Sequence, residues 1–346
     1  MRILAPVGTL PEAIKLIPLL GELEILGAKV DVALTRQASC YVDCCFKRGS
    51  IAYRLNNTYS QGLIKNVEYM NEDLCQILNN KRYNYIISVG DTSTAYSANL
   101  VGMGFQIPTI HLESGMRSGC ISRPFPEEYY RRSIDAMCSV HCCFDEHDIE
   151  NLQREGISGI SLLSYSTIYD AVDNSIGGEY IFTPRRAVVI HLHRRELRRQ
   201  DFDFLIERIV PVCKAAGREI YLLKNRRFQI DGYSCVYSDF INIINIMSHV
   251  DYIKLISSAE LVVTDSGTLQ EEAWALGVPA IIFRRETERP YLLEVGRSFL
   301  DFDARSVASC LEVAFDTSVF MSKRRYRKRV GGARTIAKYI TREVYP

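Results

Sequence analysis

Short apolar runs alternate with amphipathic helical stretches along the whole chain, and this alternation constrains the fold more than any other feature. In the first half the expected strands are RILAP (residues 2–6), KVDVALT (29–35), YNYIISVGD (83–91), PTIHLES (108–114), SVHCCFD (139–145) and ISLLS (160–164). In the second half they are AVVIHLH (187–193), EIYLLK (219–224), AELVVTD (259–265) and PAIIFR (279–284). Continuous apolar strands joined by helices are typical of parallel sheets covered on both faces, so the pattern predicts a doubly wound α/β fold.

The length of 346 residues is too great for one ordinary hydrophobic core and favours two domains. Gly177, Gly178 and Pro184 interrupt the alternation, so we place the junction in residues 169–186. We expect an N-terminal Rossmann-like domain over residues 1–168, a C-terminal Rossmann-like domain over 169–325, and a C-terminal helix over 326–346 that crosses back to the first domain. Two such domains facing one another would bind a ligand in a central cleft, at the carboxyl ends of their strands.

The charge balance argues against several classes of partner. The chain carries 42 basic and 41 acidic residues, whereas binding to nucleic acid or anionic membranes normally shows as a strong basic excess. No apolar run approaches the ~18 residues that a membrane span needs. Glu12 and Lys15 interrupt the N-terminus too early for a signal peptide. We therefore expect a cytoplasmic protein that binds neither nucleic acid nor membrane.

Eleven cysteines are scattered through the chain without a C-x-x-C pair. They predict buried free thiols in a reducing compartment rather than a disulfide framework. Cys142 and Cys143 follow His141, but neighbouring residues on a strand point to opposite faces, so we expect no metal there.

Three carboxylates follow strand ends or begin a helix in the predicted N-terminal domain. Asp91 ends the run YNYIISVGD, Glu113 ends the strand in PTIHLES, and Glu127 follows a proline at a predicted helix start. Each alone is equally well explained as a helix cap or a surface residue. Their shared position at successive strand ends favours one site.

The predicted C-terminal domain offers groups that suit a phosphate. In VVTDSGTLQEEAWALG a strand leads through a small-residue turn into a helix, so Ser266, Gly267 and Thr268 can present backbone N–H groups and hydroxyls to an anion. Glu272, one turn into the helix, can accept hydrogen bonds from ribose hydroxyls or act in capping. Basic residues follow two further strands: His193, Arg194 and Arg195 after one, and Arg284, Arg285 and Arg289 after the other.

Carboxylates in one domain and phosphate-binding groups in the other suit a diphosphate-linked substrate. The chain has no G-x-x-x-x-G-K-[ST] loop and no G-x-G-x-x-G after a predicted strand, which argues against a P-loop kinase and a Rossmann dinucleotide enzyme.

The first strand leads into another helix start, in PVGTLPEAIKLI (residues 6–17). Thr9 and Glu12 predict a capping box, and the free N–H groups and dipole of such a helix start favour an anion. The side chain of Leu10, however, has no charge or hydrogen-bond donor for a phosphate, and the first basic residue of the helix is Lys15.

With these residues assembled, the chain resembles the non-hydrolysing UDP-N-acetylglucosamine 2-epimerases, a family with the two-domain glycosyltransferase-B fold. The resemblance rests on GTLPEAIK, GDTSTAY, HLESGMRSG, PFPEE, HRRE and TDSGTLQEEAWALGVPAIIFRRETERP, whose order and context over most of the chain are highly specific.

The resemblance implies inversion at C-2 of a UDP-N-acetyl-amino sugar, UDP-GlcNAc to UDP-ManNAc or a 6-deoxy relative. Loss of the C-2 proton and of UDP gives a 2-acetamidoglucal, and UDP then adds back with protonation on the other face. By the resemblance, Asp91, Glu113 and Glu127 carry proton transfer and His193 acts on the leaving diphosphate. The implied substrate-binding residues are Lys15, Arg117, Arg194, Ser266, Gly267, Thr268, Glu272 and Arg289. No metal or other cofactor is implied, and the family analogy favours a homodimer.

Several departures from the family pattern leave the sugar and the regulation open. Leu10 replaces the arginine of the family's GTRPE motif, and Thr268 replaces a glycine of DSGG. LLKNRRF stands where a histidine-asparagine motif usually ends a strand, and LTRQASCY lacks the GQH motif tied to activation by a second substrate molecule. The alternatives are a weakly active or inactive nucleotide-sugar binding protein, a hydrolysing epimerase, and a glycosyltransferase of the same fold.

Overall fold

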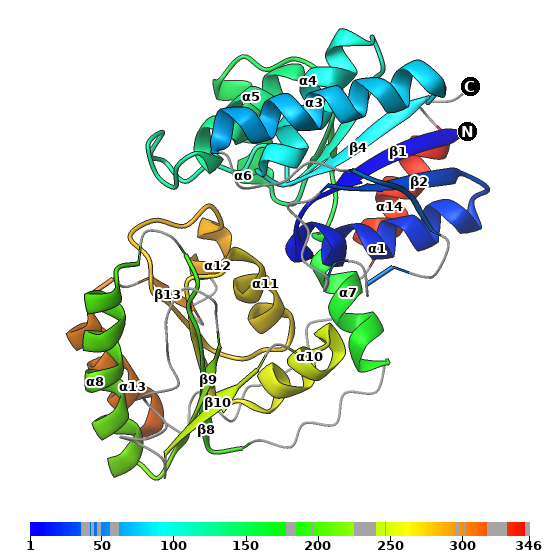
Figure 1. Ribbon diagram of the computed structural model, residues 1–346. Helices are drawn as coiled ribbons and strands as arrows, with labels where there is room; N and C mark the ends of the chain where they lie inside the picture. The colour runs from blue at the N-terminus through cyan, green and yellow to red at the C-terminus, as the bar shows by residue number, and fades with distance from the viewer. Residues whose placement is uncertain are drawn as a thin grey trace. The chain divides into compact units, whose positions relative to one another are not determined.

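The chain divides into two compact units (Figure 1), Met1–Ala171 with Arg329–Pro346 and Val172–Lys328. The structure, a computed structural model, describes residues 1–35, 42, 45–46, 50–55, 62–177, 185–194, 197–224, 240–245, 247–294, 298–300, 302–316 and 331–342.

The first unit is built on a parallel sheet, whose described strands are ordered β3-β2-β1-β4-β5-β6-β7. The strands are β1 (Arg2–Val7), β2 (Lys29–Leu34), β3 (Ile51–Arg54), β4 (Tyr85–Val89), β5 (Thr109–Leu112), β6 (Val140–Cys143) and β7 (Ile160–Leu163). The helices are α1 (Leu10–Ile25), α3 (Leu63–Asn80), α4 (Ser93–Gly104), α5 (Glu127–Met137), α6 (Glu146–Arg154) and α14 (Gly332–Arg342). The helix α7 (Thr167–Ile176) begins in this unit, and its residues from Val172 onward belong to the second unit. The strand order reverses between β1 and β4, and in sheets of this type ligands bind at the carboxyl ends of the strands beside such a reversal.

The C-terminal helix α14 completes the core of the first unit. Its Ile336 and Ile340 are fully buried in one apolar cluster with Leu16 and Leu19 of α1, and Figure 1 shows the two helices together. Asp170 caps α14, since its carboxylate accepts hydrogen bonds from the N–H groups of Gly331 at 2.6 Å and Ala333 at 3.0 Å. A helix about 160 residues distant in sequence therefore belongs to the fold of the first unit.

The second unit repeats the architecture, with its described strands in the order β10-β9-β8-β11-β12-β13, all parallel. The strands are β8 (Ala187–His191), β9 (Glu219–Leu223), β10 (Ile241–Ile244), β11 (Leu261–Thr264), β12 (Ala280–Ile282) and β13 (Ser298–Leu300). The helices are α8 (Arg199–Ala215), α10 (His249–Ser258), α11 (Gly267–Ala275), α12 (Pro290–Glu294) and α13 (Ala304–Asp316). Here the reversal falls between β8 and β11, which are followed by His193 and Ser266.

The predicted α/β class with parallel sheets is confirmed, but three strands were missed. The missed strands β3, β10 and β13 all lie at a sheet edge. The described burial of β3 and β10 shows why: every residue of β3 and three of the four residues of β10 are at least partly exposed. An edge strand packs against one neighbour instead of two, so it need not carry the continuous apolar run that marks a central strand. The fourth edge strand, β7, is mostly apolar in sequence and was predicted.

The structure also refines the expected junction and C-terminal helix. Residues 169–176 of the expected junction are helical, as part of α7, while residues 178–184 lie outside the described residues. Of the C-terminal helix expected over 326–346, α14 covers Gly332–Arg342. Residues 326–330 and 343–346 are not described.

Within the part of the chain that the structure describes, no helix combines the length and apolar character needed to cross a membrane.

The packing of α14 predicts the effect of shortening one of its side chains. Ile336→Ala should lower the free energy of unfolding by about 2–5 kcal/mol, because it leaves a cavity in the core cluster. Arg334→Ala, at an exposed position of the same helix, should change it by less than about 0.5 kcal/mol. Urea unfolding followed by far-UV circular dichroism measures both. An Ile336→Ala unfolding curve that overlays the wild-type curve would contradict the observed packing.

Candidate functional site

Two of the predicted carboxylates come together where β4 and β5 end. These strands are neighbours in the sheet; Asp91 lies two residues beyond β4 and Glu113 follows β5 directly. A Cβ added to Gly90 would lie 3.0 Å from Oε2 of Glu113, and Gly90 has a φ of 70°. The absence of a side chain at residue 90 therefore lets the Glu113 carboxylate lie against the turn that carries Asp91.

Glu113 is held in an unusual backbone conformation by a buried ion pair. Its φ of 70° lies in the left-handed region that residues other than glycine seldom adopt, and strain of this kind clusters at functional sites. Its Oε2 lies 2.6 Å from Nζ of Lys15 in α1, and each side chain is 7% exposed. Lys15 thus contacts a carboxylate in the structure, and its predicted contact with a phosphate stays a prediction.

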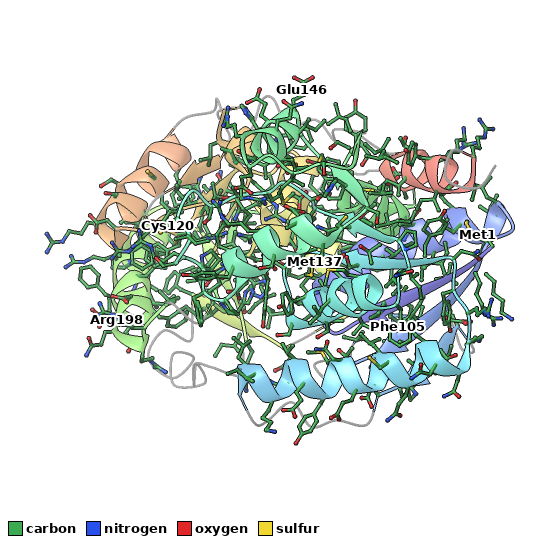
Figure 2. The ribbon with its side chains drawn as sticks, turned by 90° about the horizontal axis from the view of Figure 1, so that it is seen from above. Met1, Phe105, Cys120, Met137, Glu146 and Arg198 are labelled. Atoms are coloured by element: carbon green, nitrogen blue, oxygen red, sulfur yellow. The ribbon has the colours of Figure 1, made fainter. Side chains whose placement is uncertain are left out.

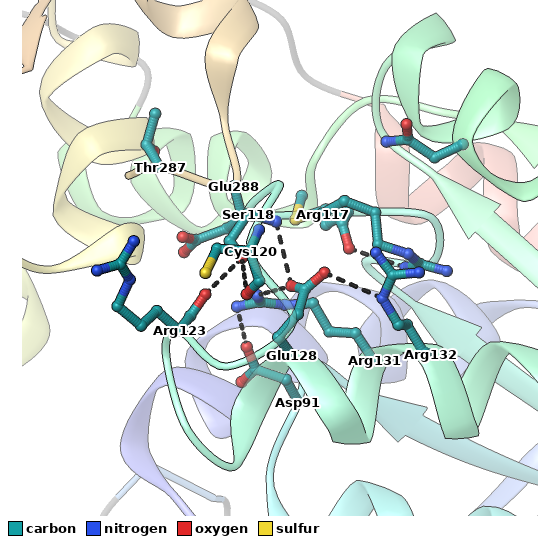
Figure 3. Close-up of polar contacts among 12 residues, drawn as sticks. Asp91, Arg117, Ser118, Cys120, Arg123, Glu128, Arg131, Arg132, Thr287 and Glu288 are labelled. Carbon is teal, nitrogen blue, oxygen red and sulfur yellow. Dashed lines mark hydrogen bonds and ion pairs between the residues drawn. The ribbon is translucent and has the colours of Figure 1, made fainter. Parts of the chain in front are cut away.

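Asp91 is held by α5, the helix that Glu127 begins. Figure 3 shows the guanidinium of Arg131 between the carboxylates of Asp91 and Glu128. Nη1 of Arg131 donates to Oε2 of Glu128 at 2.8 Å, and the same oxygen accepts the N–H of Ser118 at 3.1 Å. The Arg131 side chain is 4% exposed and that of Asp91 is 26% exposed. Asp91 is therefore fixed in place while part of it remains open to solvent.

Glu127 is the first residue of α5 and is half-buried. The partial positive charge of a helix N-terminus stabilises a carboxylate there. Because α5 also supplies Arg131, one helix carries Glu127 and orients Asp91. All three predicted carboxylates thus lie in the first unit, and their joining into one site stays a prediction.

Sequence reasoning missed Asp135, the buried centre that organises the turn after β5. Its carboxylate accepts hydrogen bonds from Ser114 Oγ, from the N–H of Gly115 at 3.0 Å and from Nη1 of Arg117 at 2.7 Å. Nδ1 of His111 lies 3.0 Å from it as well. Burial opposes ionisation, but the hydrogen bond and charge of His111 and the charge of Arg117 lower the pKa of Asp135 below its ordinary value. The sequence offered one signal for Asp135: it follows Arg131 by four residues, a spacing that places both side chains on the same face of a helix.

Arg117 was predicted to bind substrate, but its observed partners are structural. Besides Asp135, it donates to Glu155 from Nε at 2.9 Å and from Nη2 at 2.7 Å, and it is 8% exposed. These buried ion pairs raise its pKa further. A guanidinium engaged by two carboxylates has little left to offer a ligand, so its role as a substrate contact stays a prediction without support from its contacts.

The helix start at Thr9 forms the predicted capping box, and Glu12 closes it more fully than expected. Oε2 of Glu12 accepts the N–H groups of Gly8 at 2.7 Å and Thr9 at 2.6 Å, while Oε1 accepts the Thr92 hydroxyl. Desolvation raises the pKa of Glu12. Two backbone donors expected to attract an external anion are therefore occupied by the chain's own carboxylate. Leu10 is half-buried and packs against the core cluster.

In the second unit Asp265 holds the segment that follows β8. Its carboxylate accepts the N–H of His193 at 3.0 Å and that of Arg194 at 2.9 Å, and its carbonyl oxygen accepts Nε of Arg194 at 3.0 Å. Desolvation raises the pKa of Asp265. This residue directly precedes the predicted Ser266, but its role as an acceptor could not be read from the sequence. Arg195 lies outside the described residues.

The environment of His193 favours a neutral imidazole. Desolvation and then the positive charges of Arg194 and Arg284 lower its pKa below the ordinary value. The side chain is 43% exposed, and its Nδ1 lies 3.3 Å from Oδ1 of Asp265. The His193 ring lies 5.0 Å from that of His191, whose pKa is lowered to about 3, mainly by desolvation.

The start of α11 is packed directly against Arg289. Ser266 is the N-cap and accepts the N–H of Leu269 at 3.3 Å. A Cβ on Gly267 would lie 2.5 Å from Nη1 of Arg289 and 2.7 Å from Oε1 of Glu288, so a larger residue here would displace the ends of these two side chains. Thr268, also in the first turn, is half-buried.

Glu288 gathers the basic side chains that follow β8 and β12. It contacts Nη1 of Arg289 at 2.5 Å, Nη2 of Arg284 at 2.8 Å and Nη2 of Arg194 at 3.6 Å. Arg289 also donates to Glu271 at 2.9 Å. The predicted binding residues Arg194, Ser266, Gly267 and Arg289 thus lie together at one helix start. A helix N-terminus suits a phosphate. Arg289, however, is engaged by two carboxylates as Arg117 is, and it is 3% exposed, so its contact with a phosphate stays a prediction.

Figure 2 shows the side chains of the described residues on the ribbon. Among the described residues, no group of three or more His, Cys, Asp or Glu side chains could hold a metal ion. Cys142 and Cys143 are buried free thiols whose pKa values desolvation raises, to about 12 for Cys142. Two segments that differ from the family pattern, LTRQASCY and LLKNRRF, lie mostly outside the described residues, which exclude 36–41 and 225–228.

The family model of UDP-N-acetylglucosamine 2-epimerase matches residues 33–330 of the chain. The chain belongs to this family. It is therefore an enzyme of the epimerase class, as the resemblance predicted. The UDP-N-acetylglucosamine 2-epimerase of Salmonella typhimurium is 26% identical to it over 367 residues, covering 98% of this chain and 97% of that protein.

Solved structures agree on the fold of this epimerase. The S. aureus MnaA–UDP co-structure superposes with a TM-score of 0.90 at 23% identity, over 99% of this chain and 96% of that one. The Methanocaldococcus jannaschii UDP-GlcNAc 2-epimerase, in complex with UDP-GlcNAc and UDP, gives 0.86 at 24% identity, over 100% of both chains. The predicted glycosyltransferase-B class is confirmed at the level of fold.

The Asp135 contacts predict a pH-dependent contribution to stability. Because its pKa is lower in the folded state than the unfolded value of about 3.9, this contribution is present above that pH and is lost as the pH falls below it. Asp135→Asn should therefore lower the free energy of unfolding at neutral pH by about 3–5 kcal/mol. The difference from wild type should narrow below about pH 4.

Urea unfolding of both proteins across this pH range measures the effect, with Glu146→Gln, at an exposed position of α6, as the control. A difference between Asp135→Asn and wild type that stays constant from neutral to acidic pH would show that the charge of Asp135 is not its source.

Proposed function

We propose that this enzyme inverts C-2 of a UDP-N-acetyl-amino sugar, converting UDP-GlcNAc to UDP-ManNAc or acting on a 6-deoxy relative. The observation that carries the proposal is the group of carboxylates at the ends of β4 and β5 and the start of α5, in which Glu113 is held in a left-handed conformation against Lys15. Proton transfer on two faces of a sugar ring needs carboxylates held in this way.

In the proposed reaction the C-2 proton passes to a carboxylate, the electron pair of the C–H bond forms the C-1 to C-2 double bond, and the bond from C-1 to UDP breaks. The C-2 hydrogen is not next to a carbonyl, so the departing diphosphate has to take up the charge. UDP then adds back to the 2-acetamidoglucal while a proton reaches C-2 on the other face. Asp91, Glu113 and Glu127 carry these proton transfers, with Lys15 and Arg131 positioning two of them.

The second unit carries the groups that suit UDP. The first turn of α11 with Ser266, Gly267 and Thr268, together with Arg194 and Arg289, binds the diphosphate. His193 acts on the leaving group, and Glu272 accepts hydrogen bonds from ribose hydroxyls. The S. aureus protein was solved with UDP and the M. jannaschii epimerase with UDP-GlcNAc and UDP, which supports this class of ligand. A homodimer and a cytosolic location remain predictions.

One observation favours a second candidate, a nucleotide-sugar binding protein with weak or no activity. Leu10 stands where the resembling family has an arginine, and losing a charge-assisted contact with a phosphate costs about 1.5–3 kcal/mol, roughly tenfold to a hundredfold in binding. A loss of this size weakens an enzyme without abolishing its chemistry. All three predicted proton-transfer carboxylates, Asp91, Glu113 and Glu127, are present in the chain. Epimerisation therefore remains the first proposal.

Exchange of the C-2 proton separates these candidates. The protein is incubated with UDP-GlcNAc in deuterated water, and the C-2 position is followed by proton NMR. Epimerisation predicts deuterium at C-2 and formation of UDP-ManNAc. Binding without exchange would favour the binding protein, and release of free sugar would favour a hydrolysing enzyme. If UDP-GlcNAc is inert, UDP-linked 6-deoxy-2-acetamido sugars are tested in the same way.

Replacing each carboxylate by its amide should separate chemistry from binding. Asp91→Asn, Glu113→Gln and Glu127→Gln should each lower turnover by about 10²-fold or more, because an amide cannot accept the proton. Calorimetric affinity for UDP should change by less than about threefold. Glu150→Gln, at an exposed position of α6, is the control. Near-normal turnover in all three variants would refute the site assignment.

Restoring the missing charge tests the role of α1. Leu10→Arg should tighten UDP binding by about tenfold or more if the start of α1 contributes to the diphosphate site. Leu10→Met is the control, since it conserves volume without adding charge. Equal UDP affinity of the arginine and methionine variants, measured by calorimetry, would place the diphosphate away from α1.

A further inference from the structure

The carboxylate of Glu272 is buried in α11 and only partly engaged. The side chain is 2% exposed, and its Oε1 lies 2.8 Å from Nε2 of His249. The other oxygen, Oε2, makes no hydrogen bond within the described part of the chain. Oε2 is not among the fully buried side-chain atoms that lack a partner in the described residues. This oxygen is therefore open to accept a hydrogen bond from a ligand hydroxyl.

His249 is fixed at both of its ring nitrogens. Nδ1 lies 3.1 Å from Oγ of Ser175 in α7, opposite the contact of Nε2 with Glu272. A serine hydroxyl can donate to Nδ1, which places the imidazole hydrogen on Nε2, facing the carboxylate. The His249 side chain is 17% exposed, so the hydrogen bond to Glu272 is largely shielded from water.

The first turn of α10 holds His249 rigidly. Ser248 caps the helix by accepting the N–H of Asp251 at 3.2 Å. One turn further on, the hydroxyl of Tyr252 lies 2.9 Å from Nδ1 of His191, whose ring neighbours that of His193. The same helical turn is therefore attached both to Glu272 and to the segment that carries His193.

We propose that His249 is a positioning residue that orients Glu272 toward the ribose hydroxyls and so sets the preference of the enzyme for a ribonucleotide. The proposal rests on the proposed function, in which Glu272 meets the ribose of UDP. The imidazole fixes one carboxylate oxygen, and the other is left directed at the hydroxyls. A nucleotide without these hydroxyls leaves a buried acceptor unpaired, which is the means by which binding sites reject such analogues.

The test compares calorimetric affinities for UDP and 2′,3′-dideoxy-UDP in wild type, His249→Phe and His249→Gln. Wild type should bind UDP about tenfold to a hundredfold more tightly than the dideoxy analogue. His249→Phe removes the donor and should reduce this preference by about tenfold, with little change for the analogue. His249→Gln keeps an N–H near the position of Nε2 and should restore most of the preference. Val250→Ala, whose wild-type side chain is 41% exposed on the same turn, should behave as wild type.

The outcomes separate this inference from the proposed function. Equal weakening of both ligands in His249→Phe would show a merely structural role and overturn the inference, while C-2 exchange in wild type would leave the proposed function standing. Equal affinity of wild type for UDP and the analogue would also overturn it, because Glu272 would not meet the ribose. Failure of wild type to bind UDP would overturn both. Binding of UDP without C-2 exchange of any tested UDP-sugar would overturn the proposed epimerisation and leave this inference standing. Fluorescence of Trp274, in the same helix as Glu272, checks that the variants are folded.

Discussion

The buried ion pair between Lys15 and Glu113 is the interaction on which the first unit's site depends. Its charged atoms are 2.6 Å apart and both side chains are almost fully desolvated. Leaving either charge alone would cost about 3–5 kcal/mol, so the position of α1, the end of β5 and the strained backbone of Glu113 are tied to one another. Gly90 completes the constraint, because a side chain there would displace the carboxylate. A carboxylate fixed in this way keeps its direction, which the proposed proton transfer requires.

The second unit uses carboxylates for a different purpose, to arrange donors around the start of α11. Asp265 fixes the backbone of His193 and Arg194, and Glu288 draws together arginines that follow two different strands. Donors held in place before a ligand arrives need little reorganisation when it binds, and they stabilise developing negative charge more effectively than mobile ones. In both units, the strand ends place the functional side chains only approximately. Buried polar contacts between residues far apart in the sequence then fix the orientation of these side chains.

This difference explains how much the sequence could predict. Strand ends follow from apolar runs, so the placement of Asp91 and Glu113 beside one another was within reach. The partners of these carboxylates could not be predicted, because a single sequence does not show which polar groups are in contact. Lys15 and Glu113, for example, are 98 residues apart. Asp135 was not predicted for the same reason. Arg117 was predicted to bind substrate because the sequence does not show that Asp135 and Glu155 are its partners. The edge strands β3 and β10 were not predicted because partly exposed positions interrupt their apolar pattern.

The same distinction clarifies the leucine at the start of α1. The N–H groups of Gly8 and Thr9 donate to Glu12, and Thr92 ties that carboxylate to the turn beside Asp91. The backbone of the turn is thus satisfied without any ligand, and Leu10 packs its side chain against the core. An arginine at this position would act through its guanidinium alone, since the capping box is complete without it. The turn and its link to Asp91 are thus preserved with leucine at this position. Under the proposed function we therefore expect the leucine to affect nucleotide affinity or substrate choice rather than folding.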